Sequence, residues 1–286
     1  MSPPAIELQN LCIRYGSFEA VHDLSFTVRE GEIFGLLGPN GAGKTTTFHC
    51  LTRQVPLSSG TVKLLGKDIS TENDQIKPYC GYVPDTENHF DDFTPFQNLQ
   101  IYARLYNIDQ ARIDTCLELV ELQRARNLPV KTYSKGMKKK LLLARELLHQ
   151  PRLLLLDEPT ANLDVHSTDR FRHLSPNLAR QGTTVLITTH NMGEVEQVCE
   201  RVAIINHGKL IDLDSPTAFK TRHTERMVDI VLEYPSGWVR KSLPLHDASA
   251  RAELAQLLQA EIPVTLHTRE FNFYQAFLQL TGEKYN

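Results

Sequence analysis

The stretch GPNGAGKTT, residues 38–46, decides the fold of this chain. It matches the phosphate-loop pattern G-x-x-x-x-G-K-[ST], and the apolar run 33–37 before it predicts a buried strand, with a helix beginning near Gly43. Between such a strand and helix, backbone N–H groups converge on anionic phosphate oxygens, whereas a chance glycine-rich turn lacks this context. The sequence therefore predicts a site for ATP or GTP.

Two side chains of this loop have specific expected roles. Lys44 is expected to reach the β- and γ-phosphates, which also makes it a candidate catalytic residue, and Thr45 is expected to hold Mg²⁺. The other contacts come from the loop backbone and the first helical turn. The residues expected to line the nucleotide phosphates are Gly38, Asn40, Gly41, Ala42, Gly43, Lys44, Thr45 and Thr46.

Composition limits the classes of partner. With 34 acidic and 31 basic side chains, the formal net charge is −3, so no global field favours nucleic acid and no nucleic-acid partner is expected. The five cysteines are scattered and form no C-x-x-C pair, which fits a reducing compartment better than a disulfide framework or a zinc site. We see neither a signal peptide nor a run of the roughly 18 apolar residues that span a membrane. We expect a cytosolic chain, with any membrane crossing left to another protein.

Short strand patterns surround the loop. Residues 6–13 and 24–28 alternate between apolar and polar and predict a small antiparallel sheet. Tyr15 lies between them, where its ring either stacks on an adenine base or fills the core at a strand end. Further strands are expected over 60–66 and 81–85.

A helical insertion is expected over about residues 86–150, because apolar residues recur near helical spacing from about 96 to 122. Phe90, Phe93 and Phe96 gather at its entrance. These aromatic side chains form either a core cluster, which we favour, or a docking surface.

Two apolar runs end in polar side chains that suit hydrolysis. Residues 153–156 lead to Asp157 and Glu158, and residues 183–189 lead to His190. Continuous apolar runs are typical of parallel strands covered on both faces, so we expect an α/β sheet that binds its ligand at the carboxyl ends. In an ATPase, Asp157 holds Mg²⁺ and Glu158 acts as the general base toward water.

The pattern changes near residue 222 and predicts a small α+β accessory domain over 223–286. The segment lacks a glycine loop, a metal-ligand cluster and paired acids, so we expect packing or partner contacts from it. Its expected elements are strands over 228–234, 238–243 and 264–267 and helices over 248–260 and 273–280.

The pentapeptide YSKGM, residues 133–137, precedes Asp157 by about 20 residues. Together with the loop and the Asp157-Glu158 pair, it resembles the nucleotide-binding subunit of the ABC transporter family over about residues 5–220. The form YSKGM, where the family usually has LSGGQ, is similar to the ATPases of type-2 ABC exporters. The resemblance implies a P-loop (RecA-like) core with an N-terminal antiparallel β subdomain and the helical insertion, in a domain of residues 1–222.

The same resemblance assigns roles to the pentapeptide. It implies that Ser134 and the N–H of Gly136 contact the γ-phosphate from the opposite subunit, with Lys135 adding a cation nearby. Without the loop match, Ser134 is better explained as a helix cap and residues 138–140, all lysine, as a solvated face.

Four further positions match or depart from the family. His190 matches the switch histidine that contacts the γ-phosphate, and Asp164 matches the loop through which the two subunits communicate, with Asn162 standing where glycine is usual. Asp85 stands where the family has a glutamine that touches Mg²⁺ and relays the nucleotide state. A carboxylate there attracts Mg²⁺ but repels the γ-phosphate if it is unscreened.

The resemblance also implies an assembly. One chain carries one loop and one signature pentapeptide, which in the family meet only across two subunits stacked head to tail. It implies a homodimer, or a heterodimer with a similar ATPase, beneath an integral membrane permease at the cytoplasmic face of the membrane. Segment 273–282 is similar to the closing helix of type-2 exporter ATPases and favours export. The alternatives are a soluble ABC-type ATPase acting on ribosomes or DNA and a regulatory subunit with weak ATPase activity.

Overall fold

The computed structural model describes residues 3–161, 163–222, 227–234, 237–260, 263–269 and 273–282. The chain divides into two compact units, Met1–Ser215 and Pro216–Asn286. The division precedes helix α8 (Pro216–Arg222), whereas the sequence pattern placed the boundary after it. The reason is packing, because the ring of Phe219 in α8 meets that of Phe273 in α10 (Phe273–Thr281), with 5.7 Å between centroids.

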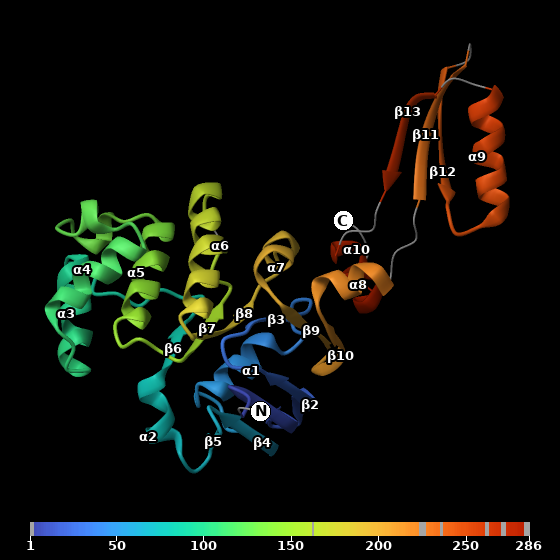
Figure 1. The fold of residues 1–286 in the computed structure, drawn as a ribbon. Helices are drawn as coiled ribbons and strands as arrows, with labels where there is room; N and C mark the ends of the chain where they lie inside the picture. The colour runs from blue at the N-terminus through green and yellow to red at the C-terminus, as the bar shows by residue number, and fades with distance from the viewer. Residues whose placement is uncertain are drawn as a thin grey trace. The chain divides into compact units, whose positions relative to one another are not determined.

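The first unit is built on a six-stranded sheet with the order β10-β9-β3-β8-β7-β6 (Figure 1). Its strands pair in parallel from β9 to β6, and β10 is antiparallel to β9. Every residue of β3, β7 and β8 is buried, as expected for strands covered on both faces. The strand bounds are β3 (Ile33–Leu37), β6 (Cys80–Val83), β7 (Leu153–Asp157), β8 (Thr184–Thr188), β9 (Arg201–Asn206) and β10 (Lys209–Asp214).

An antiparallel sheet with the order β2-β1-β4-β5 shares a core with this sheet and with helix α1 (Lys44–Leu51). Phe26 of the small sheet stacks on Phe34 of β3, with ring centroids 5.3 Å apart. The hairpin and the strand near 60–66 were expected from the sequence. Their bounds are β1 (Ile6–Tyr15), β2 (Phe18–Val28), β4 (Ser59–Leu64) and β5 (Lys67–Asp68), followed by the short helix α2 (Asn73–Ile76).

The helical insertion contains α3 (Pro95–Leu105), α4 (Gln110–Leu119) and α5 (Lys135–Leu147), and α5 packs beside β6 (Figure 1). Thr94 and Gln97 form a capping box that begins α3. The favoured interpretation of the aromatic cluster as core was wrong. Phe90 and Phe93 stack on each other at 5.6 Å and remain 48% and 42% exposed, and the ring of Phe96 lies under the guanidinium of Arg126.

Two helices follow the strands that end in the expected catalytic residues. They are α6 (Val165–Arg180) after β7 and α7 (Met192–Val198) after β8. Across the described residues, no helix is both long and apolar enough to cross a membrane.

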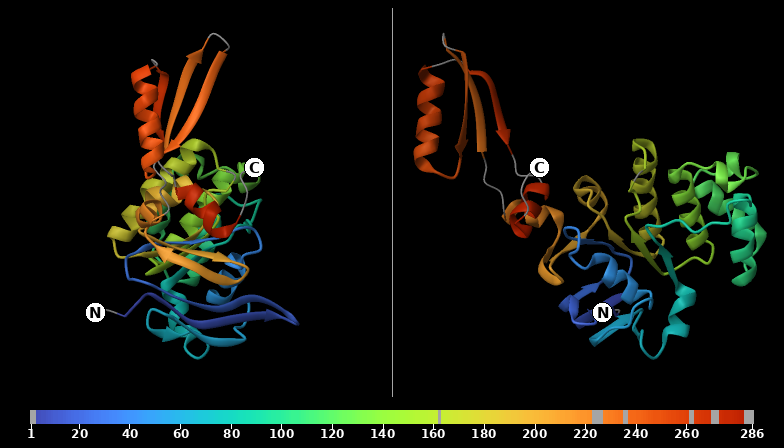
Figure 2. Two further views of the ribbon diagram at one scale, coloured as in Figure 1. Left: turned by 90° about the vertical axis from the view of Figure 1, so that its right-hand side faces the viewer. Right: turned by 180° about the vertical axis from the view of Figure 1, so that it is seen from behind.

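The second unit contains an antiparallel sheet with the order β12-β11-β13, and α9 lies alongside its strands (Figure 2). Alternating residues Val228, Ile230 and Leu232 of the central strand are buried, and Lys241 of β12 pairs with Glu253 of α9 at 2.7 Å. The elements are β11 (Met227–Tyr234), β12 (Gly237–Pro244), α9 (Ala248–Ala260) and β13 (Pro263–Arg269).

Candidate functional site

The phosphate loop joins the end of β3 to the start of α1, and two of its glycines are required by geometry. A β-carbon at Gly38 would lie 2.3 Å from the carbonyl oxygen of Ile205, which no real side chain tolerates. Gly43 is the residue before α1, and its φ of 104° lies in the region that L-residues rarely adopt. These glycines let the backbone turn tightly and present the N-terminus of α1 to a ligand.

Lys44 is 9% exposed and folds over the loop. Its Nζ donates hydrogen bonds to the carbonyl oxygens of Gly38, at 2.6 Å, and Pro39, at 3.0 Å. Thr45 follows with an exposed side chain, whereas Ala42 and Gly43 are buried. The loop thus holds one cation at its centre and one hydroxyl at its rim.

Asp157 and Glu158 follow β7 and differ in environment. Asp157 is 3% exposed and accepts a hydrogen bond from the Thr188 hydroxyl of β8. Glu158 has a φ of 47°, a left-handed conformation that costs a glutamate about 1–3 kcal/mol. Its N–H donates to the carbonyl and hydroxyl oxygens of Thr188, at 3.0 and 3.1 Å, and these bonds hold the strained residue in place.

His190 and Glu158 form a close pair. Nδ1 of His190 lies 2.8 Å from Oε2 of Glu158, and the imidazole is 72% exposed while the carboxylate is 20% exposed. Burial raises the pKa of Glu158, and the neighbouring His190 and Lys44 lower it part of the way back. A partly desolvated carboxylate oriented by a histidine has the arrangement of a general base.

Side chains whose oxygen atoms could bind a metal ion line one cavity of about 610 Å³. Thr45, Asp85, Asp157 and Glu158 all line it. A hydroxyl and carboxylates are the hard oxygen ligands that Mg²⁺ prefers, so the residues present fit this ion. Thr45 and Asp157 would hold Mg²⁺, which would neutralise developing phosphate charge.

Asp85, near the start of the loop after β6, has a side chain that is 60% exposed, and its Oδ1 lies 3.7 Å from Nζ of Lys139. Lys139 itself is only 6% exposed. The interpretation of residues 138–140 as a solvated face was therefore wrong for the central lysine. The burial of Lys139 could not be predicted, because three successive lysines show no sequence pattern that distinguishes the central one from its neighbours.

Ser134 and Gly136 lie at the start of α5 and do not line the cavity. The Ser134 hydroxyl accepts a hydrogen bond from the N–H of Met137 at 3.2 Å, so Ser134 does cap the helix. It is nonetheless exposed, as is Lys135. Gly136, by contrast, is buried, and a β-carbon added to it would lie only 3.3 Å from the side chain of Leu163. The exposed cap leaves the serine accessible to a second molecule.

Asp164 caps α6, where its carboxylate accepts hydrogen bonds from the N–H and hydroxyl of Ser167 at 2.9 and 2.8 Å. These bonds lower the pKa of the Asp164 carboxyl. A β-carbon on Gly136 would lie 3.9 Å from Asp164 Oδ2, which places the cap beside the pentapeptide. Asn162 lies outside the described residues.

Tyr15 ends β1 and is 47% exposed, so the alternative of a core tyrosine was wrong. Its hairpin runs beside the phosphate loop, because a β-carbon on Gly43 would lie 2.9 Å from the carbonyl oxygen of Ala20. The ring is accessible, and its stacking on adenine stays a prediction.

Glu194 of α7 is a second buried carboxylate that the sequence did not single out. It is fully buried, and its Oε2 accepts hydrogen bonds from the hydroxyls of Thr160, at 2.8 Å, and Thr189, at 2.9 Å. It thereby ties the loop after Glu158 to the loop that carries His190. Its Oε1 has no hydrogen-bond partner, and burial raises the pKa of the carboxyl.

The raised pKa of Glu194 predicts pH-dependent stability. A folded-state pKa above the unfolded value favours the protonated form in the fold, so this contribution is lost as pH rises through the folded pKa. In thermal melts from about pH 5 to about pH 8, Glu194→Gln should gain stability relative to wild type as pH rises. The gain should be about 1.4 kcal/mol for each unit by which folding raises the pKa of Glu194. A difference that shrinks as pH rises would contradict this assignment.

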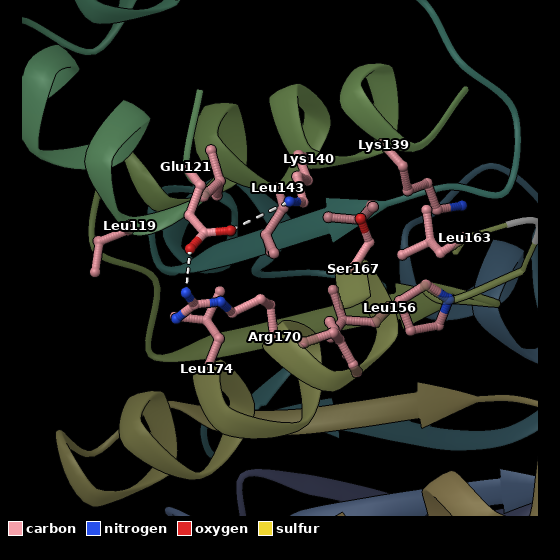
Figure 3. Close-up of a pocket in the computed structure, with 14 residues that line it drawn as sticks. Leu119, Glu121, Lys139, Lys140, Leu143, Leu156, Leu163, Ser167, Arg170 and Leu174 are labelled. Carbon is pink, nitrogen blue, oxygen red and sulfur yellow. Dashed lines mark ion pairs between the residues drawn. The ribbon is translucent and has the colours of Figure 1, made fainter. Parts of the chain in front are cut away.

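A separate pocket lies between α5, β7 and α6 and is lined mainly by apolar side chains (Figure 3). Glu121 crosses one end and pairs with Lys140 at 3.5 Å and Arg170 at 2.7 Å. The pair with Arg170 connects the helical insertion to α6, whereas the pair with Lys140 joins two segments of the insertion.

Comparison with known proteins identifies this arrangement. The profile of the ABC transporter family matches residues 21–161. An uncharacterized ABC transporter ATP-binding protein of Bacillus subtilis (strain 168) is 39% identical over 73% of this chain and 70% of its own length. The chain belongs to the ABC transporter family.

One other relative and one solved structure extend the likeness. A fluoroquinolones export ATP-binding protein of Mycobacterium tuberculosis (strain CDC 1551 / Oshkosh) is 32% identical over 98% of this chain and 94% of its own length. The solved ATP-binding subunit of an ABC transporter superposes with a TM-score of 0.70 at 23% identity, covering 76% of this chain and 92% of that one. The P-loop α/β fold of an ABC ATPase, predicted from the sequence, is thereby confirmed, and ABC ATP-binding proteins of this kind hydrolyse ATP.

Proposed function

We propose that this ABC ATPase energises export through a separate membrane permease, by forming an ATP-bound dimer that hydrolysis reopens. The observation that carries the proposal is a hydrolytic site that lacks one wall. His190 pairs with Glu158, and Lys44 lies close enough to lower the pKa of that carboxyl. Asp157 and Glu158 line the cavity of about 610 Å³, yet Ser134 and Gly136 do not. A second subunit related by a two-fold axis would supply these residues to complete two equivalent sites.

The positions of the residues support the roles that we propose for them. Lys44 and the N-terminus of α1 bind the phosphates, and Tyr15 provides an accessible ring for the adenine. Glu158 accepts a proton from the attacking water, while His190 orients the carboxylate and contacts the γ-phosphate. Ser134 and the Gly136 N–H of the second subunit close over the same phosphate, so ATP holds the dimer together and its hydrolysis weakens it.

Export is supported by the relatives. The Mycobacterium tuberculosis relative, which aligns along 98% of this chain, is named for fluoroquinolone export. A chain without a described membrane-crossing helix would need a partner to carry the cargo. We therefore infer a peripheral subunit on the cytoplasmic face, with the substrate path in the permease.

A cavity of about 280 Å³ provides a place for the permease to dock. It is lined by Thr52, Gln54, Tyr82, Tyr106 and Glu146, which come from the end of α1, from β6 and from the helical insertion. Tyr106, one of its lining residues, is exposed, and helix α3, which ends just before this tyrosine, also carries the exposed Ile101 and Leu105. Exposed apolar side chains of this kind mark interaction surfaces.

Affinity purification from detergent-solubilised membranes tests the function. We expect a partner with several apolar spans that raises the ATPase rate when the two proteins are reconstituted in lipid vesicles. Recovery of ribosomes or DNA instead would favour a soluble ABC-type ATPase, and an unstimulated rate with a bound permease would favour a regulatory subunit.

The docking cavity yields a separate prediction. Tyr106→Glu places a carboxylate beside Glu146, so a permease segment should bind poorly, and permease stimulation should fall about tenfold through like-charge and desolvation costs. Basal ATPase of the isolated subunit should stay unchanged. Leu128→Glu, at an exposed leucine of the insertion that does not line this cavity, is the control and should retain stimulation. Full stimulation of the Tyr106 variant would place the docking site elsewhere.

A further inference from the structure

Three successive lysines of α5 have different environments, although the sequence presents them as one basic run. Lys138 pairs with Asp91 at 2.9 Å and Lys140 with Glu121 at 3.5 Å, and both retain some exposure. Lys139 points away from Lys140 in Figure 3 and is 6% exposed. Only the central lysine of this run therefore enters the protein interior.

The ammonium group of Lys139 is held by backbone oxygens from two segments. Its Nζ donates to the carbonyl oxygens of Pro84, at 2.8 Å, and Asp85, at 3.3 Å, in the loop after β6. It also donates to the carbonyl oxygen of Asp157 at 3.3 Å, at the end of β7. An ammonium has three N–H donors, so these contacts account for its full capacity.

The same ammonium faces the carboxylate of Asp85, with 3.7 Å between Nζ and Oδ1. Burial lowers the pKa of Lys139, and the carboxylates of Asp85, Asp157 and Glu87 act in the opposite direction. Taking a charge out of water is costly unless it is paired and hydrogen-bonded. The surroundings of Lys139 meet both conditions.

We propose that Lys139 is a positioning residue that neutralises Asp85 at the rim of the nucleotide cavity and fixes the loop after β6 to the start of the signature helix. Asp85 lines the cavity with Thr45 and Asp157, where its charge would otherwise repel a γ-phosphate. Lys139 lets a carboxylate occupy this position without that penalty. The inference rests on the proposed nucleotide site.

The contacts also couple two parts of the site. Lys139 belongs to the second turn of α5, whose N-terminus carries Ser134 and Gly136. Its hydrogen bonds attach that helix to the loop at Asp85 and to the strand end at Asp157. A displacement of the loop when a γ-phosphate binds would move the pentapeptide toward or away from the second subunit.

Nucleotide binding by isolated variants tests the charge role. Lys139→Met leaves Asp85 uncompensated, so ATP affinity should fall about tenfold, while ADP affinity, which involves no γ-phosphate, should change less than about threefold. Asp85→Asn added to Lys139→Met should restore the ratio of ATP to ADP affinity. Lys138→Met removes a neighbouring ion pair on the same helix and is the matched control, with both affinities unchanged.

A second variant guards against misfolding of Lys139→Met. The Asp85 side chain is 60% exposed, so Asp85→Asn should fold normally and leave Lys139 as a net cation near the γ-phosphate. It should therefore bind ATP a few times more tightly, with ADP affinity unchanged. Equal losses of ATP and ADP affinity in Lys139→Met without rescue, or an unchanged ratio in Asp85→Asn, would overturn the inference. Failure of the wild type to bind ATP would instead refute the proposed function.

Discussion

Glu158→Gln is expected to abolish turnover while leaving ATP bound, with kcat reduced about 10²–10⁴-fold, the usual contribution of general base catalysis. The amide keeps the size of the side chain but cannot accept the proton of the attacking water. The main-chain contacts to Thr188 that fix this residue in its left-handed conformation remain. Because hydrolysis is what reopens the proposed dimer, the variant should accumulate as an ATP-bound dimer.

Single-turnover phosphate release and size-exclusion chromatography with ATP would measure the two effects. Glu200→Gln, at an exposed glutamate before β9, provides a matched change and should behave like wild type. A Glu158 variant with normal hydrolysis would remove the base assignment. One that lacks both hydrolysis and dimer would leave the base in place and refute the role of ATP as the bridge.

Lys44→Met is expected to weaken ATP binding at least about tenfold and to lower kcat/KM about a hundredfold or more, because the proposed role of this buried cation is to contact the phosphates in both ground and transition states. Methionine fills a similar volume but provides no N–H for the phosphate oxygens. The lysine Nζ lies against the Gly38 and Pro39 carbonyl oxygens, so the substitution removes the ammonium from the centre of the loop.

A fluorescent ATP analogue and thermal melts with and without ATP would test this prediction. The exposed strand lysine Lys63 provides the control substitution Lys63→Met. Retention of the ATP-induced stabilisation by the Lys44 variant would contradict the assignment. A lowered melting temperature without nucleotide would instead indicate that the ammonium mainly supports the loop carbonyls.

Local sequence patterns were sufficient for the parts of the site that follow strands. The apolar run before Asp157 and the one before His190 are adjacent in the sheet, so both side chains reach the same edge, and Glu158 lies beside His190 although 32 positions separate them. Parallel pairing of buried strands makes this proximity predictable. The phosphate loop was equally predictable, because its glycines are required by backbone geometry.

Other features depend on tertiary contacts and could not be predicted from the sequence. The burial of Lys139 is set by carbonyl oxygens of distant segments, and Glu194 was passed over because its hydroxyl partners belong to other loops. Exposure of Phe90 and Phe93 could not be derived from their apolar character, since the same residues suit a core or a surface. The domain boundary likewise moved because α8 packs on α10.

The stacked Phe90–Phe93 pair has a consequence for the cell. Together with Leu105, which is 75% exposed, it leaves the insertion of the uncomplexed subunit with apolar surface in contact with water. Such surface favours self-association at high concentration. Synthesis in excess of the proposed membrane partner should therefore cause aggregation, and matched amounts of the two proteins should keep the subunit in solution.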